Sequence, residues 1–297
     1  MSNVINFAVP GMYEHADLNF DLLNIYKTNP EYFMDGVGFD AFYGNFQFCI
    51  FDGGRVFEKY RQTTAEEIQE IVHIYNDIFN VPIRLIFTSN QLKPEHFTDR
   101  FSNVVLELCE NPMNQIVLVD NDLKNYIQDK YPAYSYISST TKCLTSPADF
   151  KEELKDDNFF AVCLDYNLNK NRKLLESLTP EEREKCEFLI NAICPAGCPY
   201  RKNHYRLNSL LYLNYGKAYR VPGCPVKDNT LHPDTQNSVN NLTPEEIYNW
   251  YAPQGFKHFK LEGRTLPRTE VACNYVRYMI KPEYQLYVLN ILLNRGQ

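Results

Sequence analysis

The sequence predicts an α/β fold in which eight parallel strands alternate with helices and close into a (β/α)8 barrel of the TIM type. Eight short runs rich in Val, Ile and Phe recur along the 297 residues. Amphipathic segments separate the runs and polar residues follow each of them, which is the pattern of βα units in a parallel sheet. The length suits one barrel with an insertion, and no repeat or Pro/Gly-rich linker marks a second domain.

The expected strands follow from the apolar runs, and the expected helices follow from their start signals. In chain order, the strands cover residues 4–9, 36–43, 83–88, 116–119, 134–138, 159–164, 187–191 and 256–262. A capping box formed by Thr64 and Glu67 starts a helix whose apolar residues recur at helical spacing. Thr179 and Thr243 each precede Pro-Glu-Glu and so signal two further helix starts.

The connection to the last strand is long. Segment 205–254 exceeds an ordinary link between a strand and the next helix, so we expect an insertion within the barrel at this place. Helices over residues 265–297 should complete the chain.

Composition predicts a cytoplasmic protein that does not enter a membrane. The sequence has no run of apolar residues long enough to span a bilayer, and its start lacks the pattern of a signal peptide. Nine cysteines, an odd number scattered along the chain, indicate reduced thiols rather than a disulfide framework. The net charge of −7 argues against a sequence-independent nucleic-acid binder, although a local basic patch that contacts RNA stays open.

Polar residues that follow the strands are the candidates for substrate binding. In a parallel barrel the ligand site is built from the loops at the C-terminal ends of the strands. These loops are polar in all eight units, which the exposure of loops alone could also explain. The candidate substrate-binding residues are Ser139, Thr140, Thr141, Asp165, Asn167 and Arg201.

A group of cysteines follows the seventh strand and predicts a metal centre. Cys194 and Cys198 flank a short turn that contains Gly197, and Cys224 stands in a downstream Gly-Cys-Pro. Prolines restrict such a loop and glycine permits its sharp backbone, so two thiolates can point at one ion. Soft thiolate ligands select an iron–sulfur cluster or zinc.

The spacing of the cysteines leaves the fourth ligand open. Cys186 is the candidate nearest to Cys194, while Cys163, Cys49 and Cys143 also follow or lie on strands and could reach the mouth. Cysteines among apolar neighbours are more typical of the core. That interpretation applies to Cys109, Cys163, Cys186 and Cys273.

Two other metal chemistries can be compared with the same residues. A zinc ion held by Cys194, Cys198, Cys224 and His204 would have a four-coordinate Cys3His site. A radical-SAM cluster would need a cysteine three residues after Cys198, where the chain has Arg201, so that motif is absent.

Three segments resemble the peptidase U32 family. The FKLEGR segment that ends at Arg264 is similar to the family's LKIEGR, Ser138 to Thr141 is similar to its STQ loop, and the cysteines follow the seventh strand as they do in the family. The resemblance implies a barrel with an iron–sulfur cluster, most simply 4Fe–4S. It also implies oxygen-independent hydroxylation of an aromatic quinone precursor or an RNA base, or else peptide hydrolysis.

The leading hypothesis is therefore a metal-centre barrel enzyme that acts on a small molecule or nucleobase. Its candidate catalytic residues are Glu262, Arg264 and His204. An arginine can bind a carboxylate or an anionic substrate through two parallel hydrogen bonds. The alternative is a non-catalytic, metal-stabilised protein that binds RNA or a protein partner, with Arg201, Lys202, His204 and Arg206 as the RNA contacts. A U32-like peptidase is also open.

Overall fold

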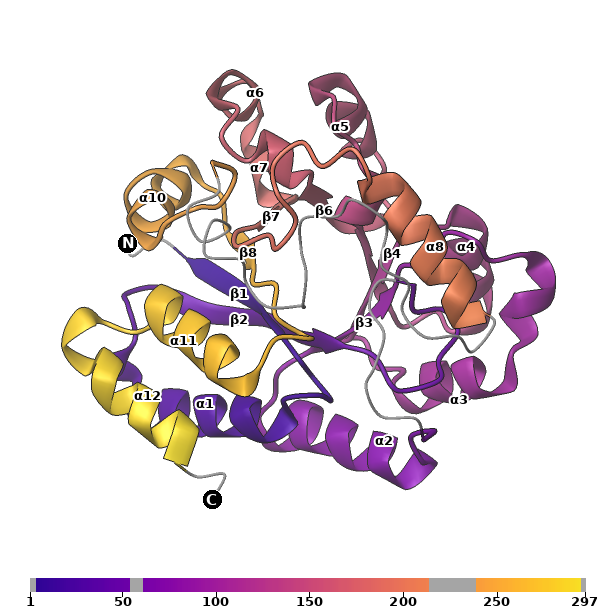
Figure 1. The fold of residues 1–297 in the computed structure, drawn as a ribbon, viewed down its shortest axis with the longest axis horizontal. Coiled ribbons are helices and arrows are strands. Elements are labelled where there is room, and N and C mark those ends of the chain that lie inside the picture. Colours follow the sequence, from indigo (N-terminus) through magenta and orange to yellow (C-terminus); the bar gives the residue numbers. More distant parts are fainter. Residues whose placement is uncertain (1–3, 54–60, 214–238, 295–297) are drawn as a thin grey trace.

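The eight predicted strands are present and form one closed, all-parallel barrel in chain order, so the predicted (β/α)8 fold is confirmed (Figure 1). The computed structural model describes residues 4–53, 61–213 and 239–294. The strands are β1 Ile5–Pro10, β2 Val37–Gly44, β3 Ile83–Phe87, β4 Gln115–Leu118, β5 Ser135–Ser138, β6 Phe159–Leu164, β7 Cys186–Leu189 and β8 His258–Lys260. β8 is shorter than expected because Glu262 leaves the sheet and donates its backbone N–H to the Asn191 side chain over 2.6 Å.

Helices surround the barrel and cover the apolar outer faces of its strands (Figure 1). The α-helices are α1 Ala16–Thr28, α2 Ala65–Val72, α3 Arg100–Leu108, α4 Asn121–Lys130, α5 Pro147–Glu153, α6 Arg172–Glu176, α7 Pro180–Glu184, α8 Arg201–Leu213, α10 Pro244–Glu246, α11 Arg268–Met279 and α12 Gln285–Asn294. Two π-helical turns are η2 His73–Ile78 and η6 Ile247–Tyr251, and the 3-10 turns are η1 Pro30–Tyr32, η3 Pro94–Thr98, η4 Thr140–Lys142, η5 Tyr166–Leu168, η7 Ala252–Gln254 and η8 Pro282–Tyr284. The predicted capping boxes at Thr64, Thr179 and Thr243 are confirmed. Among the described residues, no helix combines the length and the apolarity needed to cross a bilayer.

The inside of the barrel has a charged layer and an apolar layer. Alternate residues of a strand face the same side, so Arg84 lies one interior position before Ile86 on β3. Near the strand starts, Arg84 pairs with Glu187, and His258 pairs with Asp40. The next layer is apolar and consists of Ala8, Tyr43, Ile86, Val117, Ile137 and Ala161. Polar side chains near the strand ends complete the interior and lead into the mouth of the barrel.

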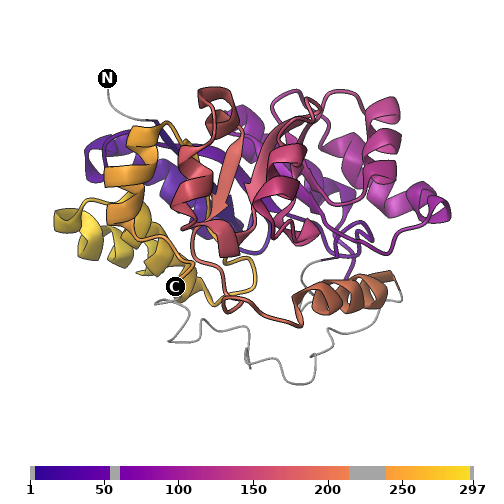
Figure 2. The same ribbon diagram turned by 90° about the horizontal axis from the view of Figure 1, so that it is seen from above.

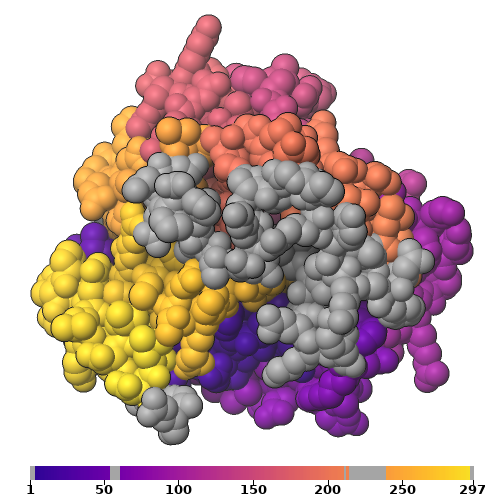
Figure 3. All heavy atoms as spheres, viewed as in Figure 1, coloured from indigo at the N-terminus to yellow at the C-terminus, as the bar shows by residue number. Residues whose placement is uncertain are grey.

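Helix α8, which follows β7, covers the mouth. α8 lies across the end of the barrel where the strands finish (Figure 2). The backbone N–H of Asn90, after β3, donates to the Ser209 hydroxyl of α8 over 3.2 Å. Segment 205–254 contains most of α8 and all of α10, η6 and η7, while its residues 214–238 lie outside the described part of the chain. In the space-filling view, α8 is at the surface in orange, with α11 and α12 in yellow below it (Figure 3).

Candidate functional site

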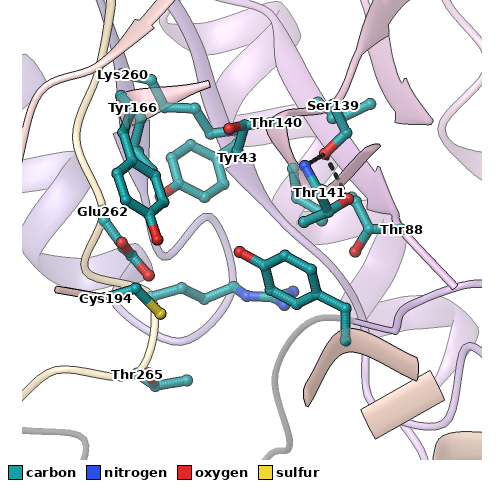
Figure 4. Close-up of a pocket in the computed structure, with 15 residues that line it drawn as sticks. Tyr43, Thr88, Ser139, Thr140, Thr141, Tyr166, Cys194, Lys260, Glu262 and Thr265 are labelled. Carbon is teal, nitrogen blue, oxygen red and sulfur yellow. Dashed lines mark hydrogen bonds between the residues drawn. The ribbon is translucent and has the colours of Figure 1, made fainter. Parts of the chain in front are cut away.

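A pocket of about 90 Å³ opens at the mouth, between the strand ends and α8 (Figure 4). The side chains around it come from the ends of seven strands or the loops after them, and from α8. They belong to Tyr43, Ile86, Thr88, Val117, Ser139, Thr140, Thr141, Tyr166, Leu189, Cys194, Tyr205, Lys260, Glu262, Arg264 and Thr265. A site in this position is what a parallel barrel provides for ligands.

Lys260, the last residue of β8, contributes a buried amine to this pocket. Its register pairs it with Ala8 of β1 and Leu189 of β7, and the residue is 8% exposed. The ammonium lies 4.5 Å from the centre of the Tyr43 ring. Burial lowers the pKa of Lys260 below its ordinary value; the Glu187 carboxylate opposes that shift and the Arg84 guanidinium adds to it.

Arg264 forms a two-pronged ion pair with a carboxylate from a distant loop. Its two terminal nitrogens donate to the Asp52 carboxylate over 2.6 and 3.2 Å, and both side chains are buried. This fork fixes the loop after β8 to the loop after β2, 212 positions earlier in the sequence. Arg264 also lines the pocket, so its position there is set from behind by Asp52.

Glu14 lies beside this pair with its carboxyl group buried. Its nearest distance to the Arg264 guanidinium is 3.7 Å, which is too long for a hydrogen bond, and both carboxyl oxygens are buried with no hydrogen-bond partner in the described chain. Burial raises the pKa of Glu14 to about 8, against the opposing charge of Arg264. Because Asp52 already occupies the guanidinium, desolvation decides the protonation state of Glu14.

Arg201, the first residue of α8, is held by a second network behind the pocket wall. It donates to the Asp165 carboxylate over 2.5 Å, to the Thr140 carbonyl over 2.7 Å and to the Tyr205 hydroxyl over 3.2 Å. Its guanidinium also stacks 4.2 Å from the centre of the Tyr166 ring. These contacts hold the start of α8 against the loops after β5 and β6.

Asn167 extends this network into the cysteine loop. Its side-chain amide donates to Asp165 over 2.8 Å. Its side-chain oxygen accepts from the backbone N–H of Gly197 over 2.8 Å and from the Asn240 amide over 2.9 Å. Gly197 has a φ of 64°, a left-handed conformation that glycine adopts without steric cost. The turn between Cys194 and Cys198 is therefore set by its backbone and by Asn167.

Glu262 has both a structural contact and a place in the pocket. Its carboxylate accepts from the backbone N–H of Ile193 over 2.9 Å, and its carbonyl accepts from the Asn191 amide over 2.9 Å. These bonds tie the loop after β7 to the loop after β8. On the opposite wall, Ser139 and Thr141 share a hydrogen bond between their hydroxyls over 2.8 Å (Figure 4).

The described residues supply only part of the predicted metal site. Cys194 lines the pocket and Cys198 is half-buried in the same loop, while Cys224 lies outside the described residues. Cys186 is fully buried as the first residue of β7 and packs in the outer core, so the structure does not bring it to the mouth beside Cys194. Within the ranges described, no three His, Cys, Asp or Glu residues are grouped to hold an ion. A complete site would need ligands beyond these two thiols.

The remaining cysteines divide between core and surface. Cys109 is buried as expected, whereas Cys273 is exposed on α11, so its predicted core position is wrong. Of the other candidates for the fourth ligand, Cys163 is the one in a cluster that Cys194 packs against. Cys49 and Cys143 are buried in the loops after β2 and β5.

The predicted site residues thus separate into a wall group and a supporting group. The wall group lines the pocket and consists of Ser139, Thr140, Thr141, Cys194, Glu262 and Arg264. Asp165, Asn167 and Arg201 bond to one another and to loops rather than lining the pocket. His204 is half-buried on α8 and is also not among the lining residues.

Sequence reasoning missed Lys260, Tyr43, Tyr166, Tyr205 and the partners of Arg264. The position of Lys260 was available from strand periodicity, because His258, Lys260 and Glu262 alternate along one face of the last strand. Comparisons with protein-family models, curated proteins and solved structures find no match, so the function has to be argued from the site itself.

Proposed function

We propose that the chain is an enzyme that acts on a small molecule bound in the mouth pocket. The observation that carries this proposal is the chemistry of the lining, where the amine of Lys260, the carboxylate of Glu262 and the phenols of Tyr166 and Tyr205 face one cavity. Groups that move protons or stabilise charge around one cavity are what barrel-mouth reactions use. The aromatic rings also suit a planar substrate such as a nucleobase.

A ligand screen with matched variants tests where such a molecule binds. Thermal shifts are measured for nucleobases, aromatic acids and small oxo acids with the wild type, with Thr141→Val and with Thr28→Val. Thr141 lines the pocket, whereas Thr28 is exposed at the end of α1, so both variants lose a hydroxyl from the same residue type. We expect ligands whose shift is reduced in Thr141→Val and kept in Thr28→Val. Equal shifts in both variants would place binding outside the pocket.

A thiolate-held metal centre at the rim is the second part of the proposal. Its support is that Cys194 lines the pocket and shares a short loop with Cys198, next to a glycine in the left-handed conformation. An iron–sulfur cluster is the first candidate and would supply redox chemistry of the U32-like, oxygen-independent hydroxylation type; zinc is the alternative. No step of the reaction is assigned to it from the described residues.

Metal analysis after anaerobic purification tests this part. Cys194→Ser and Cys198→Ser should contain less iron and sulfide, or less zinc, than the wild type, because a hydroxyl is a weak ligand for these soft metals. Cys109→Ser is the matched control, since Cys109 is buried in the core and should not affect metal content. The same metal content in all four proteins would remove the metal centre from the proposal.

The RNA-binding alternative has less support. Arg201, one of its four basic residues, is buried and already bonded to Asp165, so it is not available to a phosphate group. Lys202 and Arg206 are exposed on α8. Peptide hydrolysis in the same pocket is the other activity that the U32 resemblance implies, and incubation with a gelatin substrate distinguishes it from small-molecule chemistry.

A further inference from the structure

Lys260 differs from two other lysines that lie wholly or partly inside the protein. Lys124 is 5% exposed and pairs with Asp156 at 3.2 Å, and the partly buried Lys142 pairs with Glu153 at 2.5 Å. Within the described residues, the ammonium of Lys260 has neither an ion pair nor a hydrogen bond, and it lies over the face of the Tyr43 ring. Lys260 is therefore a buried amine whose charged form lacks the partner that such groups ordinarily have.

An unpartnered ammonium in the interior is destabilised relative to the neutral amine. Taking the charge out of water costs free energy that a carboxylate or several hydrogen bonds ordinarily offset, and the face of the Tyr43 ring offsets only part of it. The ionisable groups around it come from four other places: Glu187 on β7, Cys163 on β6, Arg84 on β3 and Arg264 after β8. Burial, together with the two arginines, favours the neutral amine, which carries the lone pair needed for nucleophilic attack.

Tyr166 supplies a second unpartnered group to the same pocket. Its side chain is 1% exposed, and its hydroxyl has no hydrogen-bond partner in the described part of the chain. Burial raises the pKa of this phenol, so it stays protonated and can donate. Figure 4 shows its hydroxyl directed into the pocket. A buried donor without a partner is costly, so a polar atom of a ligand is its natural acceptor.

We propose that Lys260 is the amine that condenses with an aldehyde or ketone group of a small substrate in the pocket. This inference rests on the proposed function and names the substrate class for it. The nitrogen lone pair adds to the carbonyl carbon, and the displaced C–O electron pair takes a proton, for which Tyr166 is the donor. The positively charged nitrogen of the adduct then releases one of its protons, and this proton leaves with the hydroxyl group as water. The nitrogen lone pair forms the C=N bond, so the products are a protonated imine, water and the Tyr166 phenolate, which takes its proton back from solvent. The step needs no oxidant or reductant.

Reductive trapping tests the amine directly. Wild-type protein is incubated near neutral pH with glycolaldehyde or pyruvate and with cyanoborohydride, which reduces the imine to a stable secondary amine, and peptide mass spectrometry locates it. Lys155, 68% exposed and paired with Glu152, is the internal reference. We expect Lys260 to be modified several times faster than Lys155, because its lowered pKa leaves more of the amine neutral and because it lies in the pocket that would hold the carbonyl compound. Modification of Lys260 no faster than of Lys155, with both probes, would overturn the inference.

A tyrosine pair tests the proton donor. Tyr166→Phe should slow the modification of Lys260 by about tenfold or more. Tyr287→Phe, at a residue that is 56% exposed on α12, should leave the rate unchanged. If ligands bind in a Thr141-dependent way but Lys260 is not modified, the role of Lys260 as the condensing amine is overturned and the proposed function stands. If no ligand depends on Thr141, the proposed function is overturned as well.

Discussion

Two layers of the barrel interior each contain a buried cation, and the two cations have different partners. Near the strand starts, Arg84 and Glu187 are both fully buried and form an ion pair, and Arg84 also donates to Gln115 over 2.8 Å. One layer nearer the mouth, Lys260 is almost as buried and faces an aromatic ring instead of a carboxylate. Both cations come from β-strands and both point inward, so the difference lies in their partners.

This difference indicates that the Arg84–Glu187 pair stabilises the barrel, whereas Lys260 is available to interact with a ligand. A buried pair is strongly destabilised when one member is removed, because the other then stays buried and alone. In that layer the ion pair decides the charge of Glu187: burial works to raise its pKa, but the Arg84 guanidinium holds the pKa below its usual value. Lys260 has no ion-pair partner among the described residues, so its removal leaves no buried carboxylate without a partner. The unpartnered layer is therefore where substitutions should affect ligand chemistry more than folding.

The largest expected effect is on the free energy of unfolding, and it appears when Arg84 and Lys260 are each replaced by methionine. Arg84→Met should lower the free energy of unfolding by about 3–5 kcal/mol, because it leaves the Glu187 carboxylate buried without its partner. Lys260→Met should cost little or increase stability, since it replaces an unpaired ammonium with an apolar chain of similar length. Urea denaturation at neutral pH measures both. A loss for Lys260→Met as large as that for Arg84→Met would break the distinction between the layers.

The sequence alone predicted the eight strands but not the ion-pair partners of the charged residues, and the reason is physical. The runs that became β1 to β8 were visible because parallel strands bury apolar residues at close spacing. The partners of a charged residue leave no such local pattern: Arg84 and Glu187 are 103 positions apart, and Arg264 and Asp52 are 212 apart. The direction of one strand was enough to predict that Glu262 and Arg264 lie near the pocket. The carboxylate that accepts both hydrogen bonds from Arg264, Asp52, could be identified only in the closed barrel.

The second expected effect concerns Glu14, the buried carboxyl group beside Arg264. Its pKa is about 8 in the fold and 4.5 ordinarily, so the unfolded chain releases this proton first as the pH rises. Stability should therefore fall between those two pH values, and Glu14→Gln should remove the fall. We expect the variant to match the wild type below pH 4.5 and to exceed it above pH 8 by up to about 5 kcal/mol, the free energy that corresponds to the shift from 4.5 to about 8.

Thermal or urea unfolding across this pH range provides the measurement. Glu95→Gln is the matched control, because the Glu95 side chain is 67% exposed and its replacement should shift stability little at any pH. A stability difference for Glu14→Gln that does not change with pH would mean that Glu14 is ionised in the fold, paired with Arg264 despite the 3.7 Å separation.

The smallest expected effect comes from His258 and Asp40, a pair in the charged layer that titrates. Burial works to lower the pKa of His258, but the Asp40 carboxylate, 2.8 Å away, raises it above 6.5 overall, with Glu187 adding to that shift and Arg84 opposing it. The stabilisation is then fully present below pH 6.5 and is lost as the pH rises through the raised value. Asp40→Asn should reduce stability below pH 6.5 by about 1 kcal/mol, and the loss should shrink at alkaline pH. Arg84→Met, in contrast, should cost the same at both pH values, because arginine does not titrate there. A loss for Asp40→Asn that is equally independent of pH would show that His258 stays neutral, and that the charged layer depends on Arg84 and Glu187 alone.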